Sequence, residues 1–133
     1  MTLTRGLLDT SVLIANESGR LLDTASLPDE AFISVITIAE LHAGVLAARD
    51  TRTRAVRLAT LESVAALEPL PVDTAAATQW ATLRVRLAEE GRRAKVNDLW
   101  IAAIAAANNL AVITQDDDFE PIEAVGGPPV LRV

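Results

Sequence analysis

The sequence predicts an α/β fold, a three-layer α/β/α sandwich around a central, mainly parallel sheet of four to five strands. Short apolar runs that suit buried strands alternate with longer helical segments along the chain, and this alternation is typical of a parallel sheet covered on both faces. Half of the 133 residues are hydrophobic but only 3% are aromatic, so the core must be mainly aliphatic. A chain of this length is expected to form one domain, residues 1–133.

The first half of the chain is expected to contain two strands. Gly6–Leu8 is apolar and is followed by the helix-capping residues Asp9 to Ser11, so a buried strand should turn directly into a short helix over Val12–Ala15. Ala31–Val35 is the second expected strand. Three further helices are expected over Leu21–Leu27, Thr37–Ala48 and Arg52–Ala66.

The second half is expected to add three strands and two helices. Asp73 suits the N-cap of a long helix over Ala75–Glu90, which Gly91 ends. A second helix is expected from Asp98 to Ala107, with Asn97 as its N-cap. The expected strands are Leu70–Val72, Ala111–Thr114 and Val130–Leu131, with an acidic turn over Gln115–Phe119 before the last of them.

The helix that begins at Asp98 is apolar on every side beyond this residue, which predicts that it is buried between layers. A carboxylate in the first turn is stabilised by free backbone N–H groups and by the helix dipole, so Asp98 could serve only to start the helix. Because a buried helix begins at or near the core, however, the same carboxylate could line a site. Asp98 alone does not decide between these roles.

Three other acidic residues are expected near Asp98. Asp9 follows the first strand and Asp116 follows the strand that ends at Thr114, and ligands of parallel sheets bind at the carboxyl ends of the strands. Glu40 lies in an apolar stretch beside small residues, so a surface position and a site position are equally expected for it. If the helix of Asp98 begins beside the strand ends, all four carboxylates share one pocket.

Four carboxylates in one pocket repel one another unless protons or a cation neutralise them. Oxygen ligands without sulfur favour Mg²⁺, with Mn²⁺ as a possible substitute. One or two such ions can activate water and stabilise the leaving oxygen in phosphodiester hydrolysis, and the number of ions stays open. The predicted metal ligands, which would also be the catalytic residues, are Asp9, Glu40, Asp98 and Asp116.

Hydroxyl groups flank these acids. Thr10, Ser11 and Thr114 could orient the carboxylates from behind, although capping and turn formation explain them equally well. In the run 116–118, the alternation of an extended segment sends Asp116 and Asp118 to the same side. Asp116 is nearest the strand end and is the predicted ligand with Asp118 assisting, but either could be the fourth acid.

Positive charge is concentrated just before Asp98, although the chain carries a net charge of −6. The overall charge argues against a protein that coats nucleic acid, and such a basic group is ordinarily a solvated helix face. Beside an acidic, metal-loaded centre the same residues become candidate phosphate contacts. They are Arg84, Arg86, Arg92, Arg93 and Lys95.

Composition excludes several other classes of site. The chain has no cysteine, hence no disulfide or thiolate metal site, and its single histidine, His42, argues against zinc. Asp9 interrupts the N-terminal apolar residues before they form a signal peptide, and no apolar run approaches the roughly 20 residues of a membrane span. We therefore expect a soluble, cytoplasmic protein without membrane association. Trp80 and Trp100 are expected in the core.

Three other interpretations fit the acids less well. A phosphatase of the haloacid-dehalogenase type would use Asp9 as a nucleophile, but its second aspartate is replaced here by Ser11. A metal-binding adhesion module would need a serine where Leu13 stands. A receiver-like module could use Asp73, but the single lysine, Lys95, does not follow a strand.

Four segments together resemble the PIN-domain ribonucleases, specifically the VapC toxins of bacterial VapBC toxin–antitoxin pairs. The resemblance extends over nearly the whole chain in the family's order, and the four segments together are specific although each alone is weak. The matching segments are Leu8–Ser11, Ile33–Leu41 with Gly44 after it, Asn97–Ala103 and Ile113–Phe119.

The resemblance implies a PIN-like fold and a Mg²⁺-dependent endoribonuclease that cleaves structured RNA, such as tRNA or ribosomal RNA, and so inhibits translation. It also implies a cognate VapB antitoxin and a homodimer. By the family pattern, Asp9, Glu40, Asp98 and Asp116 form the acidic set, with Asp9 and Asp98 the foremost metal ligands. The basic residues before Asp98 would then contact RNA.

Overall fold

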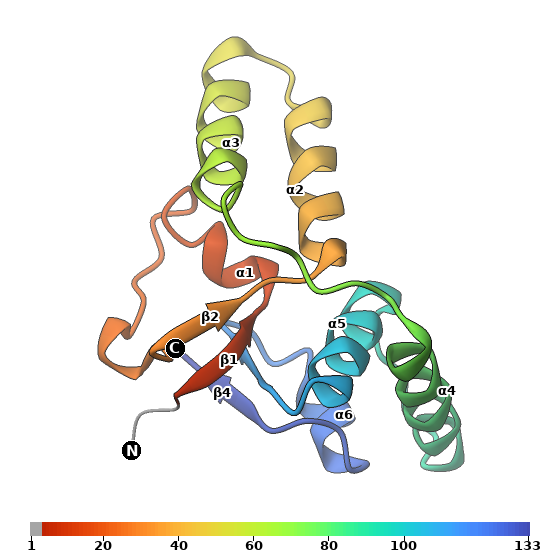
Figure 1. Cartoon of the computed structure of the whole chain (residues 1–133). Coiled ribbons are helices and arrows are strands. Elements are labelled where there is room, and N and C mark those ends of the chain that lie inside the picture. Colours follow the sequence, from red (N-terminus) through yellow and green to blue (C-terminus); the bar gives the residue numbers. More distant parts are fainter. Residues whose placement is uncertain (1–3) are drawn as a thin grey trace.

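Within residues 4–133, which the computed structural model describes, four parallel strands form one sheet in the order β2-β1-β3-β4 (Figure 1). The central strands are β1 (Arg5–Leu8) and β3 (Ala111–Thr114), and the edge strands are β2 (Glu30–Phe32) and β4 (Val130–Arg132). In the β1–β3 pair, Leu8 lies opposite Ile113, so these strands end side by side. The predicted α/β class with a parallel sheet is confirmed.

Helices cover both faces of this sheet because alternate strand residues point to opposite sides. Val112 packs in one core cluster with α4 (Thr74–Glu89), α5 (Val96–Ala107) and α6 (Glu120–Ala124). Its neighbour Ile113 packs on the other face, against α1 (Thr10–Leu13) and the segment around η1 (Thr24–Ser26). This arrangement is the expected three-layer sandwich.

The helices α2 (Val35–Ala47) and α3 (Thr51–Ser63) form a hairpin that extends beyond the sheet (Figure 1). A small core of Ile33, Leu41 and Val64 joins its base to the rest of the molecule. Two arginines fasten the helices together. Arg57 donates to the Gly44 carbonyl at 2.7 Å, and Arg54 donates to the Ala48 carbonyl at 2.9 Å.

One expected strand is shorter than predicted, and another does not form. The strand over Ala31–Val35 ends at Phe32, because the Ser34 hydroxyl accepts a hydrogen bond from the Thr37 N–H and caps α2. The strand over Leu70–Val72 is wrong, since only Leu70 forms a bridge, to Ser34. Pro71 follows it and has no N–H with which to continue a ladder.

Two helix predictions also need correction, and one observed helix was not predicted. The helix over Leu21–Leu27 is a single 3₁₀ turn, Thr24–Ser26, in which the Ser26 hydroxyl donates to the Asp23 carboxylate. The N-cap of α5 is Lys95, so the predicted cap Asn97 lies inside the first turn, as Asp98 does. Helix α6 was not predicted. No helix within the described residues is long and apolar enough to cross a membrane.

Candidate active site

Asp9 stands where β1 ends and α1 begins, and its side chain is buried, with 4% of the residue exposed. One carboxylate oxygen, Oδ2, accepts two hydrogen bonds. The Ser11 hydroxyl donates to it at 2.7 Å, and the Thr114 hydroxyl, from the end of β3, donates at 3.0 Å. One hydroxyl from α1 and one from the end of β3 thus hold this carboxylate oxygen.

Backbone N–H groups orient both of these hydroxyls. The Ser11 oxygen accepts from the N–H of Gln115 at 3.0 Å, and the Thr114 oxygen accepts from the N–H of Asp116 at 3.2 Å. Because an N–H occupies the acceptor side of each hydroxyl, its hydrogen is free to point at Asp9. The two hydroxyls therefore support the carboxylate in the way expected of residues behind a site.

Asp98 lies in the first turn of α5, where its Oδ2 atom is buried and has no hydrogen-bond partner within residues 4–133. Burial and then the neighbouring negative charges of Asp9, Asp118 and Asp116 raise the pKa of Asp98 to about 7, against a smaller opposing effect of Lys95. Burial also raises the pKa of Asp9, and the charge of Asp116 adds to this effect. These carboxylates are therefore close enough to repel one another.

The three aspartates of the acidic turn after β3 have different surroundings. Asp117 pairs with Arg132, whereas the charges of Asp116 and Asp118 both act on Asp98. The Oδ1 atom of Asp116 accepts from the N–H of Asp118 at 3.1 Å. Asp118 also pairs with the Nζ of Lys95 at 2.7 Å. We call Asp9, Asp98, Asp116 and Asp118 the acid edge.

Glu40, on α2, reaches this edge only through Thr10, the residue that follows Asp9 in the chain. The Thr10 hydroxyl donates to its Oε1 at 2.7 Å and lies 3.0 Å from the Thr37 hydroxyl. Thr10 has one hydroxyl hydrogen, so the Glu40 carboxylate and the Thr37 oxygen share it as acceptors. Thr37 is fully buried, and sequence reasoning missed it. The sequence feature that could have indicated Thr37 is its position three residues before Glu40, which places both on the same face of a helix.

A divalent cation fits the donors at this edge. A hard cation would satisfy the unpartnered Asp98 oxygen and relieve the repulsion that raises the pKa of Asp98. As they stand, no three acidic or histidine side chains of residues 4–133 lie close enough together to hold an ion. A donor set of two carboxylates suits Mg²⁺, which usually keeps several waters and takes substrate oxygens as its remaining ligands.

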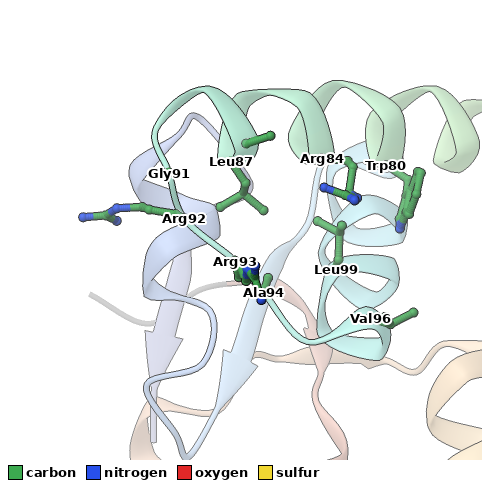
Figure 2. Close-up of a pocket in the computed structure, with 10 residues that line it drawn as sticks. Trp80, Arg84, Leu87, Gly91, Arg92, Arg93, Ala94, Val96 and Leu99 are labelled. Carbon is green, nitrogen blue, oxygen red and sulfur yellow. The ribbon is translucent and has the colours of Figure 1, made fainter.

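The five predicted basic contacts do not form one surface. Lys95 pairs with Asp118, and Arg86 donates to the Val125 carbonyl at 3.4 Å. The other three line a cavity of about 600 Å³ between α4 and α5, which Figure 2 shows. They are Arg84, Arg92 and Arg93. We call this cavity the arginine pocket.

The two tryptophans stack on each other beside the arginine pocket. Trp80 lines the arginine pocket, and its ring stacks on that of Trp100 with the centroids 5.0 Å apart. Both rings are partly buried, and Trp80 packs against the main core, as expected. The single histidine, His42, is exposed on α2.

Comparison with known proteins gives a consistent result. The model of the PIN domain family matches residues 6–124. Ribonuclease VapC5 of Mycobacterium tuberculosis is 59% identical over 128 residues, which are 96% of this chain and 95% of that protein. Ribonuclease VapC4 of the same organism is 40% identical over 119 residues, which are 90% of this chain and 92% of that protein.

The fold comparison agrees. The crystal structure of VapBC-5 from Mycobacterium tuberculosis, a member of the VapBC family of toxin–antitoxin systems, contains a similar chain. That chain superposes with a TM-score of 0.87 at 55% identity, and the alignment covers 98% of both chains.

Proposed function

Because the chain belongs to the PIN-domain family, we propose that it is the ribonuclease toxin of a VapBC-type toxin–antitoxin pair. Its activity is that of an endoribonuclease, a hydrolase of internal phosphodiester bonds. We further propose that the reaction depends on Mg²⁺ or Mn²⁺ and that the substrate is structured RNA, such as tRNA or ribosomal RNA. Cleavage of such RNA inhibits translation in the cytoplasm.

The observation that carries this proposal is the acid edge, where Asp98 has an unpartnered buried oxygen and a pKa of about 7. A structural helix start would normally be solvated or capped. Repelling carboxylates instead indicate a site for positive charge. Asp9 and Asp98 are the proposed metal ligands nearest the reaction, with Asp116 and Glu40 completing the acidic set.

The residues around these acids have separate roles in the proposed reaction. When bound, Mg²⁺ would lower the pKa of a water and neutralise charge on the phosphate. Ser11 and Thr114 hold Asp9 in one orientation. Thr10 holds Glu40, and Lys95 holds Asp118 and limits the negative charge near Asp98.

The partner of the proposed toxin is a VapB-type antitoxin, as the similarity to VapBC-5 supports. Such a partner neutralises the toxin when it covers the site. A homodimer is also proposed, on the family pattern.

The direct test is cleavage of a structured RNA by the purified protein with and without a chelator. We expect internal cuts with Mg²⁺ or Mn²⁺, no cuts with EDTA, and protection by the cognate antitoxin. In cells, new RNA 5′ ends should appear soon after induction of the wild type but not of Asp9→Ala. Cleavage that persists fully in EDTA would contradict metal dependence, and the absence of any RNA cleavage would contradict the proposed activity.

A further inference from the structure

We propose that the arginine pocket is a subsite for one unpaired nucleotide of the RNA substrate, at a distance from the acid edge. This inference rests on the proposed ribonuclease function and extends it to how the RNA is recognised. In this arrangement a base lies against the apolar floor of the pocket and its phosphate lies at the arginine rim.

The lining of the pocket suits a base and a phosphate together. Trp80 and Leu87 from α4 and Leu99 from α5 form an apolar wall. Figure 2 shows the tip of Arg84 beside Trp80, directed into the same space, whereas Arg92 extends outward from the turn at Gly91. Unpaired bases are commonly held by apolar side chains and by the flat faces of guanidinium groups.

The size of the pocket also agrees. Its volume of about 600 Å³ falls within the range of roughly 300 to 1,000 Å³ that is typical of small-ligand sites. A duplex is too wide for such a space, so an extruded or single-stranded nucleotide is the form of RNA that fits.

The charges at the rim have no ion-pair partners among the described residues. Within residues 4–133, none of Arg84, Arg92 and Arg93 forms a salt bridge, although acidic residues outnumber basic ones by 18 to 12. Three unpaired arginines around one cavity in an acidic protein indicate an anionic occupant.

The pocket and the acid edge are continuous along the chain and across the surface. Arg93 and Ala94 line the arginine pocket and also a shallower cavity that contains Asp118 and Lys95. Leu99, in the pocket wall, directly follows Asp98. One RNA strand can therefore occupy the pocket while its next phosphates approach the acids. An acidic peptide would satisfy the arginines as well, but it has no base for the apolar wall.

Intrinsic fluorescence provides a direct test, because the two tryptophans of the chain are the stacked pair at this pocket. A short single-stranded oligoribonucleotide would be titrated into the protein in EDTA, which is expected to prevent cleavage. We expect saturable quenching by the oligoribonucleotide, weaker quenching by a mononucleotide, and none by inorganic phosphate at matched ionic strength.

Kinetics of RNA cleavage with Mg²⁺ provide the second readout. Arg93→Glu should raise KM by about tenfold or more and reduce the salt dependence of binding, while kcat stays within about twofold. Arg52→Glu is the matched control, because Arg52 is exposed on α3 and the change in charge is the same. Trp80→Phe should keep most of the affinity and identify the ring that is quenched.

Several results would overturn the proposal. One is the absence of quenching together with equal KM values for Arg93→Glu and Arg52→Glu. Another is quenching by an acidic peptide but not by RNA, which would assign the pocket to a protein partner. Fluorescence that depends on protein concentration, with a changed oligomeric state in Arg93→Glu, would assign it to a second copy. If the wild type cuts no RNA, the proposed function fails, whereas normal cleavage without these effects refutes only the subsite.

Discussion

The acid edge and the arginine pocket lie on two sides of the start of α5, and they are built in opposite ways. At the acid edge, two hydroxyls and two backbone N–H groups fix Asp9 before any ligand arrives. At the pocket, three exposed arginines have no salt-bridge partner within the described residues. One region is rigid and negatively charged, and the other is adaptable and positively charged.

This difference indicates that the acid edge performs the chemistry and that the arginine pocket recognises the RNA. Chemistry requires atoms held within fractions of an ångström, so its residues need support from behind. Recognition of a flexible strand tolerates long side chains that adjust to the phosphate. Substitutions at the acid edge should therefore change kcat or metal affinity, whereas substitutions in the pocket should change KM.

Asp98→Asn should have the largest effect. The amide keeps the size of the side chain but removes the charge that a cation needs, so kcat should fall by about a thousandfold. The purified variant would be assayed for RNA cleavage with Mg²⁺, and circular dichroism would check the fold. Asp117→Asn is the matched control, because it makes the same change in the acidic turn after β3, at a residue that pairs with Arg132. Equal activities of the two variants would contradict the role given to Asp98.

Thr114→Val should have the next largest effect. The valine keeps the shape but removes the hydroxyl that donates to Asp9, so the Mg²⁺ concentration for half-maximal cleavage should rise by about 10- to 100-fold. Thr114→Ser should restore much of the affinity. Thr78→Val, which removes a hydroxyl bonded only to the Thr74 carbonyl on α4, should change nothing. An unchanged Mg²⁺ requirement in Thr114→Val would show that this hydroxyl has no supporting role.

The raised pKa of Asp98 predicts how stability depends on pH in EDTA. Between the ordinary pKa of 3.8 and the folded value of about 7, the folded state binds more protons than the unfolded state, so the free energy of unfolding falls as pH rises through this window. Asp98 is partly exposed, and solvent screening reduces the loss to about 1 to 2 kcal/mol. Urea unfolding at pH 5 and pH 8 would measure it. The decline should be smaller in Asp98→Asn, and parallel curves would contradict the prediction.

Thr37→Val should have the smallest effect. Thr37 reaches Glu40 only through the shared hydroxyl hydrogen of Thr10. Loss of one hydrogen bond typically costs about 1 kcal/mol, so kcat should change by no more than a few-fold. The kcat values of Thr37→Val and Thr37→Ser would be compared, and the serine variant should be close to the wild type. A loss as large as that of Asp98→Asn would mean that Thr37 acts directly at the site.

Much of the acid edge could be predicted because its determinants are local. Asp9 and Asp116 follow apolar runs that form parallel strands, so the sheet itself brings their side chains to one edge. Strand alternation does not extend to Asp116, Asp117 and Asp118, because β3 ends at Thr114 and residues 115–118 form bends and a turn. The roles of these residues as metal ligands stay predictions.

Other features depend on contacts between distant segments and could not be predicted. The hydroxyl of Thr37 matters because α1 brings Thr10 against it, and no local pattern encodes that contact. The prediction of a strand over Leu70–Val72 was wrong because a strand needs a neighbouring strand as its partner. The neighbouring strand β2 ends at Phe32, so only Leu70 forms a bridge. The sequence could have predicted that Arg84 and Arg86 lie on different faces of their helix, because residues two apart on a helix point in different directions.

The pairing of β1 with β3 has a consequence for synthesis of the protein. Gly6 lies beside Ala111, so the strand that presents Asp9 gains this neighbour only after some hundred further residues have been added. The hydroxyl of Thr114 and the carboxylate of Asp116 arrive at the same late stage. A ribosome-bound fragment therefore carries no assembled acid edge. The cell that makes this chain is exposed to its chemistry only after the ribosome has passed Asp116.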